Sequence, residues 1–239
     1  MVRRIHTSTL RAAGDLTLSD REAHHARDVL RLGSGDVVEL FDDAGATARG
    51  TILSSAPAGV VVRVEAPSTA AAGDVAIRLT VAAAVPKGDR AEWMIEKLSE
   101  LGAERFIPLA TARSVALPEG KNKRERWTRI ATEAAKQSRR RGVMRIEELT
   151  KLGDALADAT GAGACWHLST SAGATPVLDL VGRISPRALT AFVGPEGGWT
   201  DEELAQFESA GATGVRITPT ILRVETAAVA IASIVGSVR

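Results

Sequence analysis

Residues 192–203 connect the end of an apolar run to the start of a helix through a glycine-rich loop. The loop, Gly194 to Gly198, has the sequence Gly-Pro-Glu-Gly-Gly, and Thr200 with Glu203 forms a capping-box pattern. Ligands of open α/β sheets bind beyond the carboxyl ends of strands, and glycines let backbone amides approach a ligand closely. A plain strand-to-helix connection needs one glycine or none. Three glycines around Glu196 therefore favour a binding site.

A second segment whose residues could take part in chemistry, residues 221–228, carries polar groups at the start of an otherwise apolar helix. Arg223, Glu225 and Thr226 are either helix caps or ligand contacts, and this segment alone does not decide between them. The sequence contains neither a Gly-x-Gly-x-x-Gly dinucleotide fingerprint nor a Gly-x-x-x-x-Gly-Lys-Ser/Thr phosphate loop. Nucleotide hydrolysis and hydride transfer on a dinucleotide are therefore poorly supported.

Positive charge is concentrated in one part of a chain whose formal net charge is only +1. Residues 121–145 hold ten Lys or Arg against two Glu, a local charge of +8, which leaves 1 − 8 = −7 for the rest. Such a stretch suits a polyanion, whose phosphates it neutralises, although a solvated helix face has the same composition. With four Phe, four Trp and no Tyr, the chain is poorly supplied for stacking on single strands, and its composition suits recognition of shape and phosphates better.

Length and composition exclude several classes of protein. The 239 residues include 45% hydrophobic residues, enough for a folded core, but no apolar run of about 18 residues that would cross a membrane. The start of the chain lacks the apolar core of a secretory signal. The one cysteine, Cys165, forms neither an internal disulfide nor a multi-thiolate zinc site. We therefore expect a cytoplasmic protein with no metal and no membrane partner.

The elements of the first part of the chain indicate a small β-barrel. A capping box at residues 19–22 predicts a helix, and three turn-bounded runs at residues 37–41, 48–53 and 60–64 predict strands. Residues 66–74 are small and poor in bulky apolar groups, which is typical of a linker. The predicted domains are residues 1–70 and residues 74–239.

The second part alternates strands and helices, which predicts an α/β domain with a mainly parallel sheet. Predicted strands cover residues 76–85, 105–109, 165–168 and 189–193. Predicted helices begin at residues 89, 122, 200 and 225, and the second of these is the basic helix 122–139. The loop 194–198 then follows the last of the predicted strands.

These segments together resemble the RsmE family of SPOUT-superfamily methyltransferases over nearly the whole chain. The resemblance rests on blocks of the family's sequence that occur here in order: His24-His25 to Arg31, Lys87 to Arg90, Trp93 to Lys97, Arg113-Ser114, Glu133 to Arg139, Gly194 to Gly198 and Ile221 to Ala227. Each block alone is moderately specific, whereas their order and spacing are strongly so. The chain departs from the family pattern at residues 217–220, Ile-Thr-Pro-Thr.

The resemblance implies a PUA-like RNA-binding barrel followed by a SPOUT domain with a trefoil knot, acting as a homodimer. It implies methylation of N3 of one uridine in 16S ribosomal RNA of the small ribosomal subunit, with S-adenosylmethionine as the methyl donor. Two alternatives remain open: a related SPOUT enzyme that methylates the ribose 2′-oxygen or another RNA, and an RNA-binding module without catalysis.

The expected cofactor residues are carried over from the same resemblance, and the expected RNA contacts follow from the resemblance together with the positive charge of the chain. Those expected to hold the cofactor are Leu168, Ser169, Thr170, Val193, Gly194, Pro195, Glu196, Gly197, Gly198, Ile217, Leu222, Glu225, Thr226 and Ala227. Those expected to contact RNA are Arg3, Arg4, Arg27, Arg31, Lys87, Arg113, Lys136, Gln137, Ser138, Arg139 and Arg140.

Three residues are expected to be catalytic. Methyl transfer from a sulfonium is an in-line displacement, and uracil N3 becomes a good nucleophile only as its proton leaves. Arg223 is expected to stabilise the resulting anion. Glu196 or Glu225 is expected to accept the proton or to balance the sulfonium charge, with a structural salt bridge or helix cap as the alternative for each.

Overall fold

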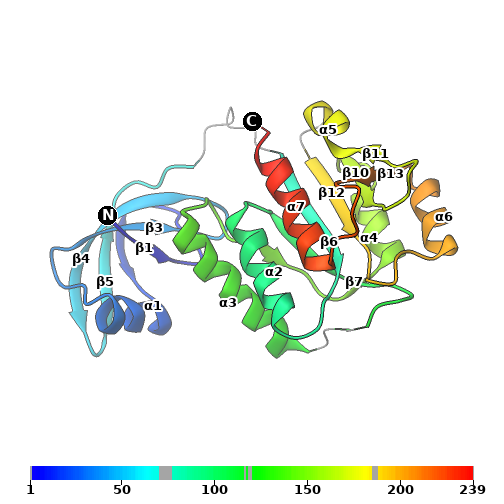
Figure 1. Ribbon diagram of the computed structural model, residues 1–239. Helices are drawn as coiled ribbons and strands as arrows, with labels where there is room; N and C mark the ends of the chain where they lie inside the picture. Colours follow the sequence, from blue (N-terminus) through cyan, green and yellow to red (C-terminus); the bar gives the residue numbers. More distant parts are fainter. Residues whose placement is uncertain (1, 70–76, 116, 118–119, 185–187, 239) are drawn as a thin grey trace. The chain divides into compact units, whose positions relative to one another are not determined.

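The structure is a computed structural model that describes residues 2–69, 77–115, 117, 120–184 and 188–238 (Figure 1). The chain forms two compact units, which we call the N-terminal unit and the C-terminal unit. The N-terminal unit comprises residues 1–74 together with residues 135–143, and the C-terminal unit comprises residues 75–134 and 144–239. Of the predicted linker 66–74, residues 70–74 lie outside the described residues.

In the N-terminal unit, a short helix accompanies a five-stranded sheet formed by the described residues. Its elements are β1 (Arg3–His6), β2 (Gly14–Thr17), α1 (Asp20–His24), a π-helical turn η1 (His25–Val29), β3 (Val37–Phe41), β4 (Thr47–Ala56) and β5 (Gly59–Val64). The strand order is β1-β3-β4-β5-β2, with β1 parallel to β3 and the other pairs antiparallel. The sequence predicted β3, β4 and β5 but not β1 or β2.

Alternating side chains of this sheet form the core of the N-terminal unit. Leu40, Ile52 and Val62 are buried with the apolar residues of α1. Gly50 of β4 lies where a Cβ would be 2.5 Å from Leu40 and 2.6 Å from Val62, so only glycine fits between these core side chains. The last residues of a later helix, described below, complete this unit.

The C-terminal unit is an α/β fold. Its elements are β6 (Arg78–Ala84), α2 (Asp89–Glu100), β7 (Arg105–Ala110), α3 (Lys121–Ser138), β8 (Arg145–Ile146), β9 (Thr150–Lys151), α4 (Leu152–Ala159), β10 (Ala164–Leu168), β11 (Thr175–Pro176), α5 (Val177–Leu180), η2 (Val181–Arg183), β12 (Ala188–Val193), α6 (Asp201–Ser209), β13 (Thr213–Arg216) and α7 (Val224–Gly236). Helix α3 is shared, because its residues 135–138 pack in the N-terminal unit.

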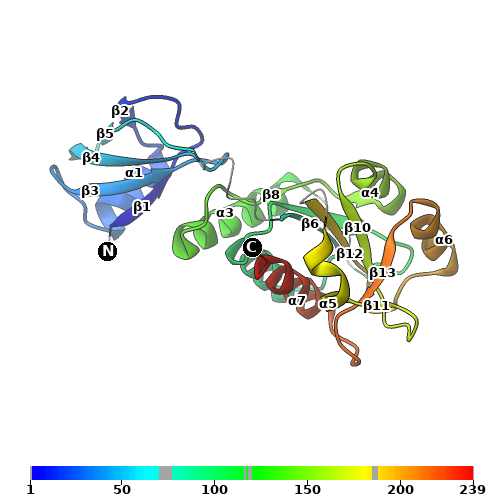
Figure 2. The same cartoon turned by 90° about the horizontal axis from the view of Figure 1, so that it is seen from above.

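All described strand pairs of this sheet are parallel, in the order β11-β13-β10-β12-β6-β7-β8, with β9 also paired to β7. Figure 2 shows α7 on one side of the sheet and α4 and α6 on the other. Strand β12 is buried at every position because helices cover both faces, which explains why Thr190 is its one polar residue. None of the helices in the described part of the chain has the length and apolar character that a membrane span requires.

Candidate active site

Three loops meet at one edge of the sheet of the C-terminal unit. Strand β10 lies between β12 and β13 and is parallel to both, with His167 opposite Phe192 and Leu168 opposite Val215. The carboxyl ends of these strands therefore lie side by side. The loops that follow them, residues 168–170, 193–198 and 217–227, are the segments that the sequence assigned to the cofactor.

Trp199 joins the first two loops. Its indole Nε1 donates a hydrogen bond to the carbonyl oxygen of Leu168 at 3.1 Å. Gly194 leaves space for this ring, because a Cβ at that position would lie 2.8 Å from Trp199 Cε2. The predicted capping box is present: Thr200 Oγ1 accepts from Glu203 N, and Glu203 Oε2 accepts from Thr200 N. The glycine at 194 and the capped start of α6 thus fix the path of the second loop.

Arg113 also holds the second loop. Its guanidinium donates to the carbonyl oxygen of Gly197 at 2.7 Å and to that of Trp199 at 3.5 Å. The neighbouring amide of Ala112 donates to Glu203 Oε1 at 2.9 Å. The sequence assigned Arg113 to RNA, whereas its contacts in this structure shape the glycine-rich loop.

Arg90, at the start of α2, joins the second loop to the third. Its Nη1 donates to Glu196 Oε1 at 3.0 Å and to Glu225 Oε1 at 3.4 Å. The hydrogen bond to Glu196 and the charge of Glu225 raise the pKa of Arg90 above its ordinary value. Arg90 is not among the site residues expected from the sequence. The signal was available, since Arg90 begins a helix directly after β6, which is the neighbour of β12.

Glu225 has an environment that its position in the sequence did not reveal. Its side chain is only 7% exposed, and its Oε2 is buried without a hydrogen-bond partner in the described structure. A buried carboxylate oxygen is costly to leave unpaired, and the positive end of the α7 dipole offsets only part of that cost. The oxygen is therefore available to a polar ligand held between the loops.

Arg223 is the N-cap residue of α7, and no side chain caps this helix. The cap interpretation of Glu225 and Thr226 therefore finds no support at this helix start. The Arg223 side chain is exposed and makes no hydrogen bond or ion pair with the described residues. Thr226 is exposed, Ala227 is buried, and Ile217 and Leu222 are half-buried.

The residues assigned to RNA differ in how far the structure exposes them. Arg3, Arg31, Lys87, Gln137 and Arg139 are exposed, whereas Ser138 and Arg140 are half-buried and Arg27 binds Asp28 and the carbonyl oxygen of Ala56. Arg4 and Lys136 are buried and have internal partners, so we do not retain them as RNA contacts. Lys136 Nζ lies 2.5 Å from Glu22 Oε1, with side chains 8% and 5% exposed.

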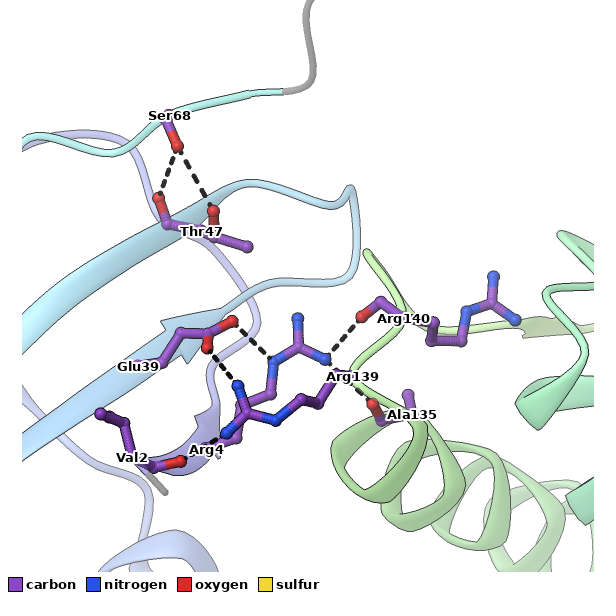
Figure 3. Close-up of polar contacts among 8 residues, drawn as sticks. All are labelled: Val2, Arg4, Glu39, Thr47, Ser68, Ala135, Arg139 and Arg140. Atoms are coloured by element: carbon purple, nitrogen blue, oxygen red, sulfur yellow. Dashed lines mark hydrogen bonds and ion pairs between the residues drawn. The ribbon is translucent and has the colours of Figure 1, made fainter. Parts of the chain in front are cut away.

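Arg4 holds the end of α3 within the N-terminal unit. Its guanidinium donates to Glu39 Oε1 at 3.1 Å, to the carbonyl oxygen of Ala135 at 3.0 Å and to that of Arg140 at 2.6 Å, as drawn in Figure 3. It also lies over the ring of Phe41, 4.0 Å from the centroid. Burial lowers the pKa of Arg4, and the carboxylate of Glu39 opposes this shift. No sequence pattern predicted these contacts between residues far apart in the chain.

No group of three or more His, Cys, Asp or Glu side chains that could hold a metal ion occurs in the described ranges. The residues at the sheet edge instead suit an organic cationic cofactor. Two carboxylates, loop carbonyl groups and a glycine-rich backbone surround the edge, and one carboxylate oxygen there lacks a partner.

Comparison with known proteins identifies the family. The family model described as the RNA methyltransferase domain matches residues 74–236, and the RNA methyltransferase PUA domain matches residues 18–65. The chain belongs to this RNA methyltransferase family. It is 32% identical over 223 residues to ribosomal RNA small subunit methyltransferase E of Bacillus subtilis (strain 168), covering 90% of this chain and 87% of that protein.

Two further relatives of this RNA methyltransferase cover almost the whole chain. The enzyme of the same name from Mycobacterium tuberculosis (strain CDC 1551 / Oshkosh) is 31% identical over 238 residues, 97% of this chain and 90% of that protein. A Legionella pneumophila protein solved with bound SAM superposes with a TM-score of 0.85 and 25% identity, covering 98% of this chain and 97% of the other. The family and fold class predicted from the sequence are confirmed.

Proposed function

We propose that this RNA methyltransferase transfers the methyl group of S-adenosylmethionine to N3 of one uridine in 16S ribosomal RNA. The names of its relatives, ribosomal RNA small subunit methyltransferase E, support the substrate, and the Legionella protein with SAM supports the cofactor. The observation that carries the proposal is the buried, unpartnered Glu225 Oε2 among three adjoining loops. A homodimer, a knotted cofactor site and a cytoplasmic location belong to the same proposal.

The residues at the sheet edge have separate roles in cofactor binding. S-adenosylmethionine supplies a methyl group on a positively charged sulfur. The backbone of Leu168 to Thr170 and of Val193 to Gly198 provides amide and carbonyl groups for its polar atoms, while Leu222 provides an apolar wall. Glu225 and Glu196 provide negative charge, and Arg90 holds both carboxylates in place. Because Glu225 is buried and Glu196 is exposed, we assign cofactor binding to Glu225 and proton acceptance to Glu196.

Arg223 is assigned to the RNA side of the reaction. Its guanidinium makes no hydrogen bond to the described residues, and Arg223 lies in the third loop directly before α7. A cation there stabilises the negative charge that develops on uracil O2 and O4 as the N3 proton leaves. The enzyme thus combines orientation of the two reactants with charge stabilisation.

The decisive experiment uses the purified protein, S-adenosylmethionine with a labelled methyl group and small ribosomal subunits that lack the modification. Nucleoside mass spectrometry of the 16S RNA is expected to find label in 3-methyluridine. Label in a 2′-O-methylated nucleoside would support the alternative SPOUT activity instead. Calorimetry with S-adenosylmethionine alone distinguishes the enzyme from an RNA-binding module without catalysis, because a module that binds no cofactor would release no heat.

A further inference from the structure

A groove of about 760 Å³ crosses the N-terminal unit beside the arginine cluster of Figure 3. Its walls come from β3 and β4, from the segment after β5 and from the residue that follows α3. The cofactor loops lie in the other unit of the chain, so this groove is a separate feature. The proposed reaction leaves it without a role.

The surfaces of the groove are of two kinds. Val2, Val37 and Ala66 offer apolar atoms, and Val2 is 46% exposed although it is a large aliphatic residue. Thr47 and Ser68 offer hydroxyl groups, whose oxygens lie 3.3 Å apart. An apolar surface bordered by hydroxyls accommodates a flat ring with polar edges.

The charge beside the groove is positive. Glu39 is shared by two guanidinium groups: its Oε1 accepts from Arg4 Nε at 3.1 Å and its Oε2 accepts from Arg139 Nη1 at 3.1 Å. Arg49 lies opposite Glu39 in the register of β3 and β4, and its Nε is 3.9 Å from Oε1 of Glu65. Three guanidinium groups face two carboxylates, so the local charge is 3 − 2 = +1. The Arg49 side chain is 65% exposed and carries this charge to the solvent.

Arg139 is fixed in an unusual backbone conformation next to the same groove. Its φ is 57°, in the left-handed region that residues with side chains seldom adopt. The hydrogen bonds from Nη1 to Glu39 and from Nη2 to the carbonyl oxygen of Val2, at 2.7 Å, hold the side chain there. The wall of the groove is therefore arranged before any ligand arrives, which lowers the entropy cost of binding.

We infer that this groove binds an unpaired nucleotide of the RNA substrate, with its base on Val37 and Ala66 and its phosphate beside Arg49. The inference rests on the proposed function, which makes RNA the partner. An unpaired base exposes its face and its edges, whereas a duplex hides them, so a slot of this size beside the exposed cation of Arg49 fits a single strand. The groove thus adds a contact for substrate selection away from the methyl-transfer site.

Two variants test the two halves of the groove. Arg49→Ala removes the cation, and Ala66→Trp fills the slot without a change of charge. Arg11→Ala is the matched control, because Arg11 is an exposed arginine of the same unit outside the groove. Fluorescence anisotropy measures binding of a labelled single-stranded 16S RNA fragment, a hairpin duplex and intact small subunits at several salt concentrations, and thermal denaturation verifies folding.

Arg49→Ala is expected to weaken single-strand binding about 5-fold, the size of an exposed charge contact, and to lower the salt slope by about 0.7. Ala66→Trp is expected to weaken it at least as much with the salt slope unchanged, while Arg11→Ala has a smaller effect. Equal losses of RNA affinity in all three variants would overturn the inference. Weaker binding to intact subunits with unchanged binding to the RNA fragment would also overturn it, because the groove would then contact a ribosomal protein. Calorimetry with S-adenosylmethionine is expected to match the parent for every variant. A parent that binds no cofactor refutes the proposed function, whereas the groove is judged by RNA binding alone.

Discussion

Arg90 and Glu225 are 135 positions apart in the chain, yet Arg90 Nη1 lies 3.4 Å from Glu225 Oε1. Each residue stands in the first turn of its helix, α2 and α7, beside the same sheet edge. The same guanidinium nitrogen binds Glu196 of the glycine-rich loop. One cation thereby fixes the relative position of the second and third of the three loops at the sheet edge.

Replacing Arg90 with Gln is expected to weaken binding of S-adenosylmethionine about 10-fold, because two neighbouring carboxylates lose the cation between them. Isothermal titration calorimetry measures the change. Arg90→Lys is the matched control: it keeps the charge, and we expect intermediate affinity because an ammonium lacks the planar fork of guanidinium. Parent-like affinity in Arg90→Gln would show that the loops hold their positions without this contact.

Replacing Gly194 with Ala is expected to lower cofactor affinity by about 10-fold through packing alone. The new Cβ would lie 2.8 Å from Trp199 Cε2, so the indole must move and its hydrogen bond to Leu168 breaks. Gly182→Ala is the control, since a Cβ there meets no atom within 4 Å. Calorimetry measures the affinity of both variants for S-adenosylmethionine, and equal affinities would contradict the steric argument.

Replacing Arg223 with Ala is expected to reduce kcat about 100- to 1,000-fold, the cost of losing one group that stabilises a developing anion. Cofactor affinity and thermal stability are expected to remain those of the parent, because Arg223 is exposed and has no hydrogen bond to the described residues. Single-turnover methylation of small subunits measures the rate, and Arg223→Lys is expected to retain part of it. A loss of cofactor affinity equal to the loss of rate would assign Arg223 to cofactor binding instead.

Replacing Lys136 with Met is expected to destabilise the N-terminal unit by about 3–5 kcal/mol, because Glu22 keeps a buried charge without its partner. Hydrogen-exchange mass spectrometry of β1 and β3 in increasing urea measures this free energy. Lys121→Met on the same helix is the control, since its exposed ion pair with Glu125, at 3.7 Å, contributes less than about 1 kcal/mol. Similar losses in the two variants would contradict a role for burial.

Burial raises the pKa of the Cys165 thiol from 9.0 to about 11. In the folded chain the thiol stays protonated at pH 8, so iodoacetamide is expected to react about 100-fold more slowly than in the urea-unfolded chain. Cys165 is the one cysteine of the sequence, so mass spectrometry reports this site alone. Because the pKa is higher in the folded chain, the free energy of unfolding is expected to fall as pH rises from about 9 to about 11, where the thiol ionises mainly in the unfolded chain. Equal reaction rates would refute the raised pKa.

The sequence predicted elements best where local pattern and final environment agree. Strand β12 is apolar at five of its six positions because both faces of the sheet are covered there, and the capping box at Thr200 begins α6 as expected. Strand β13 was missed because its four residues, Thr213 to Arg216, include a glycine and a single fully buried residue. Its identity as a strand depends on pairing with β10 and β11, which no local pattern records.

Part of the candidate site was likewise predictable from the sequence, and part was not. The resemblance to the RsmE family identified the three loops. The strand-then-loop pattern by itself pointed only to the glycine-rich loop after β12, because a loop that follows a strand lies at that strand's carboxyl end. The sequence did not identify Arg90 as the residue that joins Glu196 and Glu225, and it assigned Arg4 and Lys136 to RNA from their charge. Charge is a property of a residue, whereas burial and partners are properties of its surroundings.

The amino-acid sequence by itself determined the family, the α/β class and the segments expected to hold the cofactor, since these follow from local residue patterns and their order. Tertiary structure decided which charged groups are paired, as with Lys136 and Glu22, and which remain available, as with Arg223. It also brought residues 135–143 into the N-terminal unit. Those outcomes depend on contacts between positions far apart in the chain, whose energies arise only when folding removes the groups from water.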